Sequence, residues 1–493
     1  MRIEALFTRP RRQSPYAILF ILLKLGRNIV RYGWPALLVI LFNSKDSPWT
    51  TVYGLFLLFA VLSAISSILS YFRFYFYVQD DELIIERGLL QHTRINIPFE
   101  KIQTVNFRQN VFHQFLGVVQ LEIDTAGSAR SELSIEALDR IEAEQLRTFL
   151  MEKQVPVEVE QEEDARPRQT EIFRLTIRDL LRIGISQNHL RTAGIFLAFI
   201  VGLLENLEEF TGFRVYEEIG EGILHFSMAF LLRTLVLGAG LLFLSFFGSM
   251  ILTVIRHYNL RLWQSDSGFK LEAGLFERRE KSVQLRRIQF LKWRQNYLQR
   301  RLHLFQLSLH RAAGLQNNET RQAISIPGLR QDQVERVRKA YFPGFDPAEA
   351  QRSGISRRVI GRRFLWIGVS PLLILWLVKW NQWPVMIGIS IVWLCSIWLT
   401  SIRYHRNWQF WIHPEGILTQ SGIFGRQHYF LKWPHLQSIQ LRQSWYQRRK
   451  GLVTLLFYTA SGVVRLPYIP LQQAQAIRDY CLYTLESRPI SWM

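Results

Sequence analysis

A polar triplet, Arg-Gln-Asn or Arg-Gln-Ser, occurs three times in this chain of 493 residues. The copies are Arg108-Gln109-Asn110, Arg294-Gln295-Asn296 and Arg442-Gln443-Ser444. Arginine offers a planar fork of donors that fits a phosphate group, and the neighbouring amide or hydroxyl can hydrogen-bond a lipid headgroup or a peptide backbone. A structural role fits equally well, in which Asn or Ser caps the next helical turn and Gln satisfies backbone groups. We predict these nine residues as candidate ligand- or partner-binding residues and leave the structural role open.

Further basic residues follow the second and third triplets: Arg300, Arg301, Arg448, Arg449 and Lys450. Such clusters create a diffuse positive field that attracts anionic lipid headgroups, so we add these five residues to the candidate site. The third copy is also rich in aromatic residues, including Trp433 and Trp445. Aromatic rings are typical of membrane interfaces and binding surfaces, but packing against the chain's own helices explains them equally well.

The triplet belongs to a longer repeat that begins at a glycine, namely Gly88, Gly274 or Gly422. An Ile-Gln or Leu-Gln pair follows fourteen and fifteen residues later: Ile102-Gln103, Ile288-Gln289 and Leu436-Gln437. The triplet starts twenty residues after the same glycine in every copy. Identical spacing without a gap indicates one small module present three times. We interpret the pair as part of the core and the strand register of that module.

Alternating apolar residues predict β-strands in each copy. Phe74, Phe76 and Val78 alternate with tyrosines, which gives a strand with two different faces. A turn, a second strand and the repeat glycine follow, and the glycine indicates a bulge or a sharp bend. Each module is predicted to end with a helix: Glu136–Met151, Asp332–Tyr341 and Leu471–Leu485. About seven short strands with one closing helix make an α+β module, a small curled sheet or barrel.

A long apolar segment precedes each module. The charge-free stretches are Ser47–Phe72, Thr234–Ile255 and Trp380–Ile402, and each has the roughly 20 residues that a membrane helix needs. Shorter apolar runs come before them: Tyr32–Ser44, Thr192–Leu204 and Phe364–Val378. The paired runs predict three helical hairpins in the membrane. The alternative is three single spans with short interfacial segments, which puts the second module on the opposite side of the membrane from the other two.

Charge placement favours the hairpins. The segment Glu205–Gly222, a far-side loop in the hairpin arrangement, carries six glutamates and one arginine, while the whole chain has a net charge of +20. Basic residues in the cytoplasm and an acidic loop outside are what the positive-inside rule predicts. We therefore predict a multi-pass membrane protein with both termini and all three modules in the cytoplasm.

Basic amphipathic stretches precede the hairpins: Tyr16–Arg31, Ile172–Arg191 and Ile355–Arg363. Between Ile172 and Arg182, apolar and basic residues recur at helical spacing, which predicts a helix lying in the headgroup layer. The same pattern also fits the first turn of the membrane helix.

The strand number, the closing helix and the repeated Ile-Gln and Arg-Gln-Asn motifs resemble the bacterial pleckstrin-homology (PH)-like domain. The whole arrangement resembles the YdbS/YdbT-type family of bacterial membrane proteins, in which such domains alternate with paired membrane helices. The resemblance covers Asn28–Leu485 and implies a fold and a membrane location, and it supplies no enzyme activity. We predict that this membrane is the bacterial cytoplasmic (inner) membrane. His303 stands where the other copies have Gly117 and Gly451, and Ser444 replaces Asn, so the three copies need not bind the same ligand.

The predicted domains follow from these segments. Residues 1–31 form a basic interfacial segment; residues 32–72, 192–255 and 364–402 form the membrane hairpins; residues 73–153, 256–342 and 403–493 form the PH-like domains; and residues 154–191 (acidic, then amphipathic) and 343–363 form the linkers.

Motifs for nucleotides, metals or catalytic nucleophiles are missing from the sequence. It has no HExxH, GxxxxGK or GxSxG pattern, and its two cysteines and eleven histidines lack metal-binding spacing. His303 and His310 lie on or next to a strand, where we expect surface histidines. We predict no enzyme activity, no cofactor and no metal. The basic residues cluster at the ends of apolar segments, so we also predict no nucleic-acid partner.

Together these features predict a non-enzymatic, membrane-anchored scaffold. Its three modules would bind anionic phospholipid headgroups or a membrane-protein partner, and three tethered weak sites would give avidity. A role in envelope homeostasis or defence follows from the location alone. The alternative is a transporter or lipid-moving protein whose six helices form a path, although the spans carry no internal charges. The sequence leaves the oligomeric state unknown.

Overall fold

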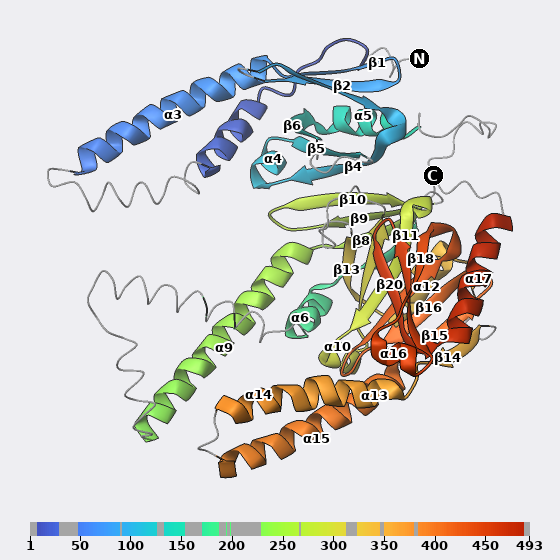
Figure 1. Ribbon diagram of the computed structural model, residues 1–493. Helices are drawn as coiled ribbons and strands as arrows, with labels where there is room; N and C mark the ends of the chain where they lie inside the picture. Colours follow the sequence, from blue (N-terminus) through green and yellow to red (C-terminus); the bar gives the residue numbers. More distant parts are fainter. Residues whose placement is uncertain are drawn as a thin grey trace. The chain divides into compact units, whose positions relative to one another are not determined.

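The computed structural model describes residues 7–28, 48–88, 91–125, 133–152, 170–186, 194, 198, 228–265, 268–311, 323–345, 350–378 and 383–487 (Figure 1). The chain forms two compact units. The first comprises Met1–Thr170, Leu262–Val283 and Ala313–Asn317, and the second comprises the rest of the chain. The boundary therefore passes through the second copy of the repeat.

Long helices occupy the three charge-free stretches: α3 (Pro48–Phe72), α9 (Met228–His257) and α15 (Trp383–Asn407). Three helical segments of the described chain are long and apolar enough to cross a membrane by length and composition: Gly238–His257, Arg358–Trp376 and Ile387–Asn407. Leu57–Phe72 is a shorter apolar helix. The predicted charge-free stretches are therefore helical in the described part of the chain, and their division into membrane hairpins stays a prediction.

The third pair of helices is described over both of its members. α13 (Arg358–Arg363), the π-helical turn η3 (Phe364–Val369) and α14 (Ser370–Val378) run on without a break. Trp393 Nε1 on α15 donates to the Gly368 carbonyl at 3.1 Å, and Trp376 Nε1 donates to Ser390 Oγ at 3.0 Å, so the two helices pack side by side. The runs Tyr32–Ser44 and Thr192–Leu204 lie outside the described residues, apart from residues 194 and 198.

Over its described residues, each copy of the repeat has six strands and a closing helix. In the first copy these are β1 (Tyr75–Gln79), β2 (Glu82–Arg87), β3 (Thr93–Pro98), β4 (Ile102–Gln109), β5 (Val118–Thr125), β6 (Leu133–Asp139) and α5 (Arg140–Glu152). In the second they are β8 (Arg261–Ser265), β9 (Gly268–Ala273), β10 (Arg278–Gln284), β11 (Ile288–Gln295), β12 (Phe305–Arg311), β13 (Ala323–Leu329) and α12 (Gln331–Tyr341). In the third they are β15 (Gln409–His413), β16 (Gly416–Ser421), β17 (Arg426–Lys432), β18 (Leu436–Arg442), β19 (Leu452–Thr459), β20 (Gly462–Pro470) and α17 (Leu471–Ser487).

A further strand precedes the second and third copies, namely β7 (Thr170–Arg174) and β14 (Gln351–Gly354). In the first copy an isolated bridge joins Arg11 to Phe76 of β1 in the same way. The predicted α+β fold of about seven strands is therefore confirmed.

The predicted alternation places one face of each strand in a core. Phe74, Phe76 and Val78 are buried between the partly exposed Tyr75 and Tyr77. In the third copy the core surrounds Trp433, which is completely buried and donates from Nε1 to the His413 carbonyl at 3.1 Å. Each core buries large apolar side chains, which is the main favourable contribution to folding.

The repeat glycines make the predicted sharp bend after the second strand. Gly88, Gly274 and Gly422 all have positive φ, at 130°, 117° and 135°. A Cβ at Gly88 or Gly274 would lie 1.9 or 2.0 Å from the carbonyl oxygen three residues further on. Only glycine fits this conformation and this close approach, which explains the residue type at the start of the repeat.

Strands from neighbouring copies pair with one another. In the first unit the strand order is β6-β5-β4-β10-β9-β8, so β4 of the first copy pairs with β10 of the second (Figure 1). In the second unit the order is β13-β12-β11-β17-β16-β15-β14, so β11 of the second copy pairs with β17 of the third. We call the pair β4 and β10 the first junction, and the pair β11 and β17 the second junction.

Two boundaries differ from the predictions. The helix expected from Ile172 starts later, because Ile172 and Phe173 belong to β7 and α6 (Ile177–Ile185) begins only after Thr176. Thr176 and Asp179 form a capping box that fixes this start. The closing helix of the first copy begins at Arg140, since the residues just before it pair with β5 as strand β6.

Candidate functional site

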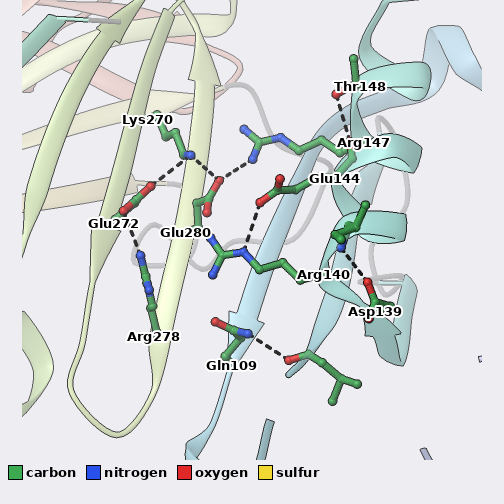
Figure 2. A network of polar contacts seen from close by, with 12 residues as sticks. Gln109, Asp139, Arg140, Glu144, Arg147, Thr148, Lys270, Glu272, Arg278 and Glu280 are labelled. Atoms are coloured by element: carbon green, nitrogen blue, oxygen red, sulfur yellow. Dashed lines mark hydrogen bonds and ion pairs between the residues drawn. The ribbon is translucent and has the colours of Figure 1, made fainter. Parts of the chain in front are cut away.

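The glutamine of the triplet makes the same hydrogen bond in all three copies. Gln109 Nε2 donates to the Val118 carbonyl at 2.9 Å (Figure 2). Gln295 donates to Leu304 at 3.0 Å, and Gln443 donates to Leu452 at 2.9 Å. Each bond ties the end of one strand to the start of the next, because the acceptor carbonyl lies next to or within β5, β12 or β19. The structural role foreseen for these glutamines is therefore present.

The third residue of each triplet caps a short helix. Asn110 Oδ1 accepts from the His113 amide at 2.9 Å and starts α4 (Val111–Phe115). Asn296 Oδ1 accepts from the Gln299 amide at 2.7 Å and starts α10 (Tyr297–Arg301). Ser444 Oγ accepts from the Gln447 amide at 3.3 Å and starts α16 (Trp445–Arg449). These are ordinary N-cap bonds, and ligand binding by the Gln, Asn and Ser residues stays a prediction.

The arginine differs between the copies. Arg108 pairs with Glu277, which precedes β10, and with Glu122 on β5 at 3.3 Å. Burial alone would lower the pKa of Arg108, but the two carboxylates outweigh burial and raise this pKa above its usual value. The positive charge of Arg108 is therefore balanced within the first unit.

Within the part of the chain that the structure describes, Arg294 and Arg442 have no such acidic partners. Arg294 is exposed and its Nε donates to Gln306 Oε1, a neutral amide, at 3.0 Å. Arg442 is also exposed, and no carboxylate of the described residues lies within ion-pair distance of it. The three predicted arginines thus occupy equivalent positions in the repeat, but the charges around them differ. Arg442 in the third copy is the most accessible to an anion.

The short helix after each triplet exposes large apolar side chains. On α4, Val111, Phe112 and Phe115 are exposed, Phe115 to 88%. On α10 the exposed side chains are Tyr297 and Leu298. On α16 the tryptophan Trp445 is 70% exposed. Large exposed side chains therefore recur at the same place in every copy, and sequence reasoning identified only the aromatic residues of the third copy.

Basic residues accompany these apolar side chains in two copies. Arg300 and Arg301 on α10, and Arg448, Arg449 and Lys450 at α16, are all exposed. The Arg449 guanidinium lies 3.7 Å from the centre of the Trp445 ring, a cation–π contact, and Arg301 lies 5.9 Å from the Tyr297 ring. The predicted basic residues therefore lie beside the exposed rings.

The first copy carries a buried histidine instead. His113 contacts Asn110 Oδ1 through Nδ1 at 2.7 Å and the Glu136 carbonyl through Nε2 at 3.0 Å, and its ring stacks on Phe20. Burial lowers its pKa, and this outweighs the bond to Glu136. The first copy thus presents apolar residues without the cluster of cations.

The histidines singled out from the second copy behave differently from one another. His303 is exposed, as expected, and its φ of 53° matches the 69° of Gly117 and the 63° of Gly451, so it adopts the same left-handed turn. The expectation that His310 is a surface residue is wrong, because His310 is buried and stacks on Phe290 at 4.2 Å. Alternation along β12 turns Leu307 and Leu309 to one face, so His310 lies on the opposite face, where Phe290 of the paired strand β11 covers its ring.

The first junction also contains a network of charged side chains (Figure 2). Glu280 is buried and pairs with Lys270 at 2.8 Å and with Arg147 of α5. Lys270 also reaches Glu272 at 3.0 Å, and Arg278 reaches Glu272 at 3.3 Å. The network joins the closing helix of the first copy to two strands of the second.

A cavity of about 410 Å³ lies in the second unit. Its lining is mainly apolar and includes Phe342 and Trp433, with Glu415 and Lys432 as its charged residues. Burial lowers the pKa of Lys432, and this outweighs the effect of Glu415. Among the described residues no cluster of His, Cys, Asp and Glu could hold a metal ion.

The similarity of this chain to known proteins has the same threefold repeat. A family model described as bacterial PH domain matches residues 20–154, 218–343 and 363–484. The UPF0699 transmembrane protein YdbT of Bacillus subtilis (strain 168) is 23% identical over 478 residues, which covers 91% of this chain and 92% of that protein. Each of the three matches includes one copy of the repeat and the long charge-free stretch before it.

Proposed function

This chain belongs to the bacterial PH domain family and is a membrane protein with three such domains, and from this we propose that it is a non-enzymatic scaffold that binds anionic lipid headgroups. The observation that supports the proposal is the short helix after each triplet, which exposes large apolar side chains, beside cations in two copies. Segments that lie on membranes combine these two features, since apolar groups enter the headgroup layer while cations meet the lipid phosphates.

The third copy has the strongest features for this role. Trp445 carries an indole suited to the headgroup level, and Arg449 stacks on that ring. Arg442, Arg448 and Lys450 add exposed positive charge nearby in the sequence. Each basic residue near an anionic surface contributes about 1 kcal/mol. Three or four such residues therefore give useful binding where a single one would not.

We also propose that the three modules lie in the cytoplasm. The cytoplasmic leaflet of a bacterial inner membrane is the surface that juxtamembrane basic segments meet, and positive residues are retained on that side. The acidic segment Glu205–Gly222 would then lie outside the cell. A membrane-protein partner is the alternative ligand for the exposed helices.

The experiment places a fluorophore at the proposed contact in the full-length chain. Trp445→Cys, in a Cys395→Ser background with the buried Cys481 retained, is labelled with an environment-sensitive dye. The protein is reconstituted in lipid nanodiscs of phosphatidylcholine alone or with phosphatidylglycerol. We expect a blue-shifted emission and quenching by doxyl-labelled lipid in the anionic discs, and less of both at high salt because exposed charges are screened.

Matched charge removals separate a local contact from a general effect of charge. Arg448→Gln, Arg449→Gln and Lys450→Gln together should abolish the difference between the two lipids. Arg330→Gln, Lys339→Gln and Arg465→Gln remove the same charge from other exposed positions and should leave the difference in place. Emission that is equally unquenched in both lipids, from correctly folded protein, would rule out headgroup binding and direct attention to a protein partner.

A further inference from the structure

The two junctions follow one rule along the chain. The third strand of a copy pairs with the fourth strand of the copy before it, as β10 pairs with β4 and β17 pairs with β11. At each of the two ends of this series, one strand has no strand of a neighbouring copy with which to pair. Within the described residues, β3 pairs only with β2, and β18 pairs only with β19.

Both junctions have the same register when positions are counted from the repeat glycines. Arg278 lies four residues after Gly274, and it pairs with Gln109, which lies twenty-one residues after Gly88. Arg426 and Gln295 have the same offsets from their own glycines and are also paired. The register therefore belongs to the repeat, although the side chains at the two junctions are unlike.

The end strand β18 is exposed where its counterparts are covered. Ser438 and Gln440 of β18 are exposed to solvent. The residues at the same repeat positions are buried in β4, where Thr104 is 1% and Asn106 is 6% exposed. In β11 the counterpart of Ser438 is Phe290, which is 3% exposed. An unpaired strand edge presents a row of backbone donors and acceptors that another strand can join.

The opposite edges of the end sheets are already partly covered. The outer side of β1 carries the bridge from Arg11 to Phe76, and on β20, at the edge opposite β18, the Tyr468 carbonyl accepts from the Ser356 amide at 2.8 Å. Strand addition at the ends of the series is thus directed to β3 and β18. These two edges are complementary, because β3 is the third strand of its copy and β18 is the fourth strand of its copy. A third strand and a fourth strand pair at each of the two junctions.

We propose that β18 of one molecule pairs with β3 of a second copy of this chain, in the register of the two internal junctions. That register pairs Thr93 with Arg442, Arg94 with Leu441 and Asn96 with Ile439. We choose a second copy of this chain as the partner because the two internal junctions show that a third strand pairs with the edge of a fourth strand, and they show in which register. The contact is head to tail, so it closes into a ring or continues as an open chain.

The side chain of Arg442 stays accessible in this arrangement. Its counterpart Arg294 remains exposed although β11 is paired with β17. Strand pairing uses the backbone of β18, whereas headgroup binding uses the side chains of Arg442 and of α16. The proposed contact between copies and the proposed lipid contact are therefore independent of one another.

The test uses two forms of the full-length chain that each carry one new cysteine. One form has Thr93→Cys, the other has Arg442→Cys, both have Cys395→Ser, and the two carry different tags. Paired residues in antiparallel strands lie about 4.5–5.5 Å apart at Cα, within the range that a disulfide spans. We expect oxidation of membranes from co-expressing cells to give a two-chain product that carries both tags.

A shift of one residue provides the control. Arg94→Cys replaces Thr93→Cys, and both positions are exposed, so their reactivity is comparable. The shift puts the two thiols on opposite faces of the sheet. We expect several-fold less two-tag product from Arg94→Cys with Arg442→Cys. Equal yields from the two pairs, or no two-tag product from folded protein, would overturn the proposal.

A single chain with both Thr93→Cys and Arg442→Cys distinguishes the remaining arrangements. Products of two or more chains support pairing between copies. A cross-link that leaves the mass of one chain would show that β18 and β3 pair within the molecule, and a one-tag product with a foreign protein would show another partner. Either of these two results overturns the proposal.

Discussion

The first junction is held by charged side chains, whereas the second is held by rings and buried apolar residues. At the first, Glu280 faces Phe107 across the strands and gathers Lys270 and Arg147 around its carboxylate. At the second, Trp293 faces His428, and their rings stack at 5.2 Å. The two junctions nevertheless share one register.

This difference shows that the backbone hydrogen bonds and the side chains determine different properties of a junction. The ladder defines which strands meet and in what register, because both junctions repeat the same offsets with unlike residues. The side chains then decide how strongly each junction holds and which conditions weaken it. Buried apolar contacts lose most when a side chain is truncated, and ionic contacts respond to charge removal.

The largest effect is expected from Phe430→Ala at the second junction. Phe430 is completely buried, pairs with Leu291 and contacts the rings of Phe342 and Phe345 at 5.3 and 4.7 Å. Truncation of a buried phenylalanine costs about 3–5 kcal/mol of unfolding free energy. We expect a lower melting temperature by intrinsic fluorescence and faster hydrogen exchange in β11 and β17.

Phe115→Ala is the matched control for that substitution. Phe115 is 88% exposed, so its removal should change the unfolding free energy by no more than about 0.5 kcal/mol. The role given to the second junction would be wrong if both variants melted at the same temperature as the parent.

A smaller effect is expected from Glu280→Gln at the first junction. Glu280 is buried and accepts from Lys270 and Arg147, so the neutral amide removes the negative charge that both cations share, while Lys270 keeps its pair with Glu272. Hydrogen bonds to charged groups contribute about 1.5–3 kcal/mol, and we expect a loss in that range. Hydrogen exchange should increase in β4 and β10, with β11 and β17 unchanged.

Glu144→Gln tests whether burial causes that loss. Glu144 pairs with Arg140 at 3.2 Å on α5 and is 56% exposed (Figure 2). Exposed pairs one helical turn apart contribute only about 0.3–0.5 kcal/mol, so exchange at the first junction should barely change. Equal effects of the two substitutions would remove the distinction between a buried network and a surface pair.

Sequence reasoning identified the modules and missed the junctions, for a physical reason. Alternation and fixed glycine spacing report which residues face a core, and they predicted β1, β2 and the bend at Gly88. An alternating pattern does not specify the neighbour of a strand, because the backbone groups that form the ladder are the same in every residue. The pairing of β10 with β4 therefore left no signal in one sequence.

The candidate site was predictable in position and only partly in role. The equal spacing located the triplets, but a cap and a ligand contact require the same polar residue types, so Gln109 and Asn110 stayed ambiguous. The unequal surroundings of Arg108 and Arg442 depend on Glu277, which is distant in sequence from Arg108. Exposure of Phe112 and Phe115 could not be told from core packing, because apolar residues serve both.

The smallest expected effect is a difference between the two junctions in how their stability depends on pH. Burial, aided by Lys292, lowers the pKa of His310 to about 4, and burial, aided by Arg426, does the same for His428. A histidine whose pKa is lower in the folded state contributes stability that is complete above its unfolded pKa of about 6.5 and is lost as pH falls towards 4. The second junction should therefore lose about 1 kcal/mol between pH 7 and 6.

The first junction should resist the same change in pH. Burial raises the pKa of Glu277, but Arg279 and Arg108 outweigh burial and hold this pKa below 4.5, so its contribution is lost only at pH values under 4.5. Hydrogen exchange at pH 7 and 6, corrected for the intrinsic rate, should show a larger loss of protection in β11 and β17 than in β4 and β10, because His113 of the first copy, whose pKa burial also lowers, lies on α4 outside those strands. His428→Phe keeps a ring on Trp293 without a titrating group, and it should remove about half of the loss. A loss shared equally by β4 and β10, or one that His428→Phe leaves intact, would mean that protonation acts elsewhere than at the stacked rings.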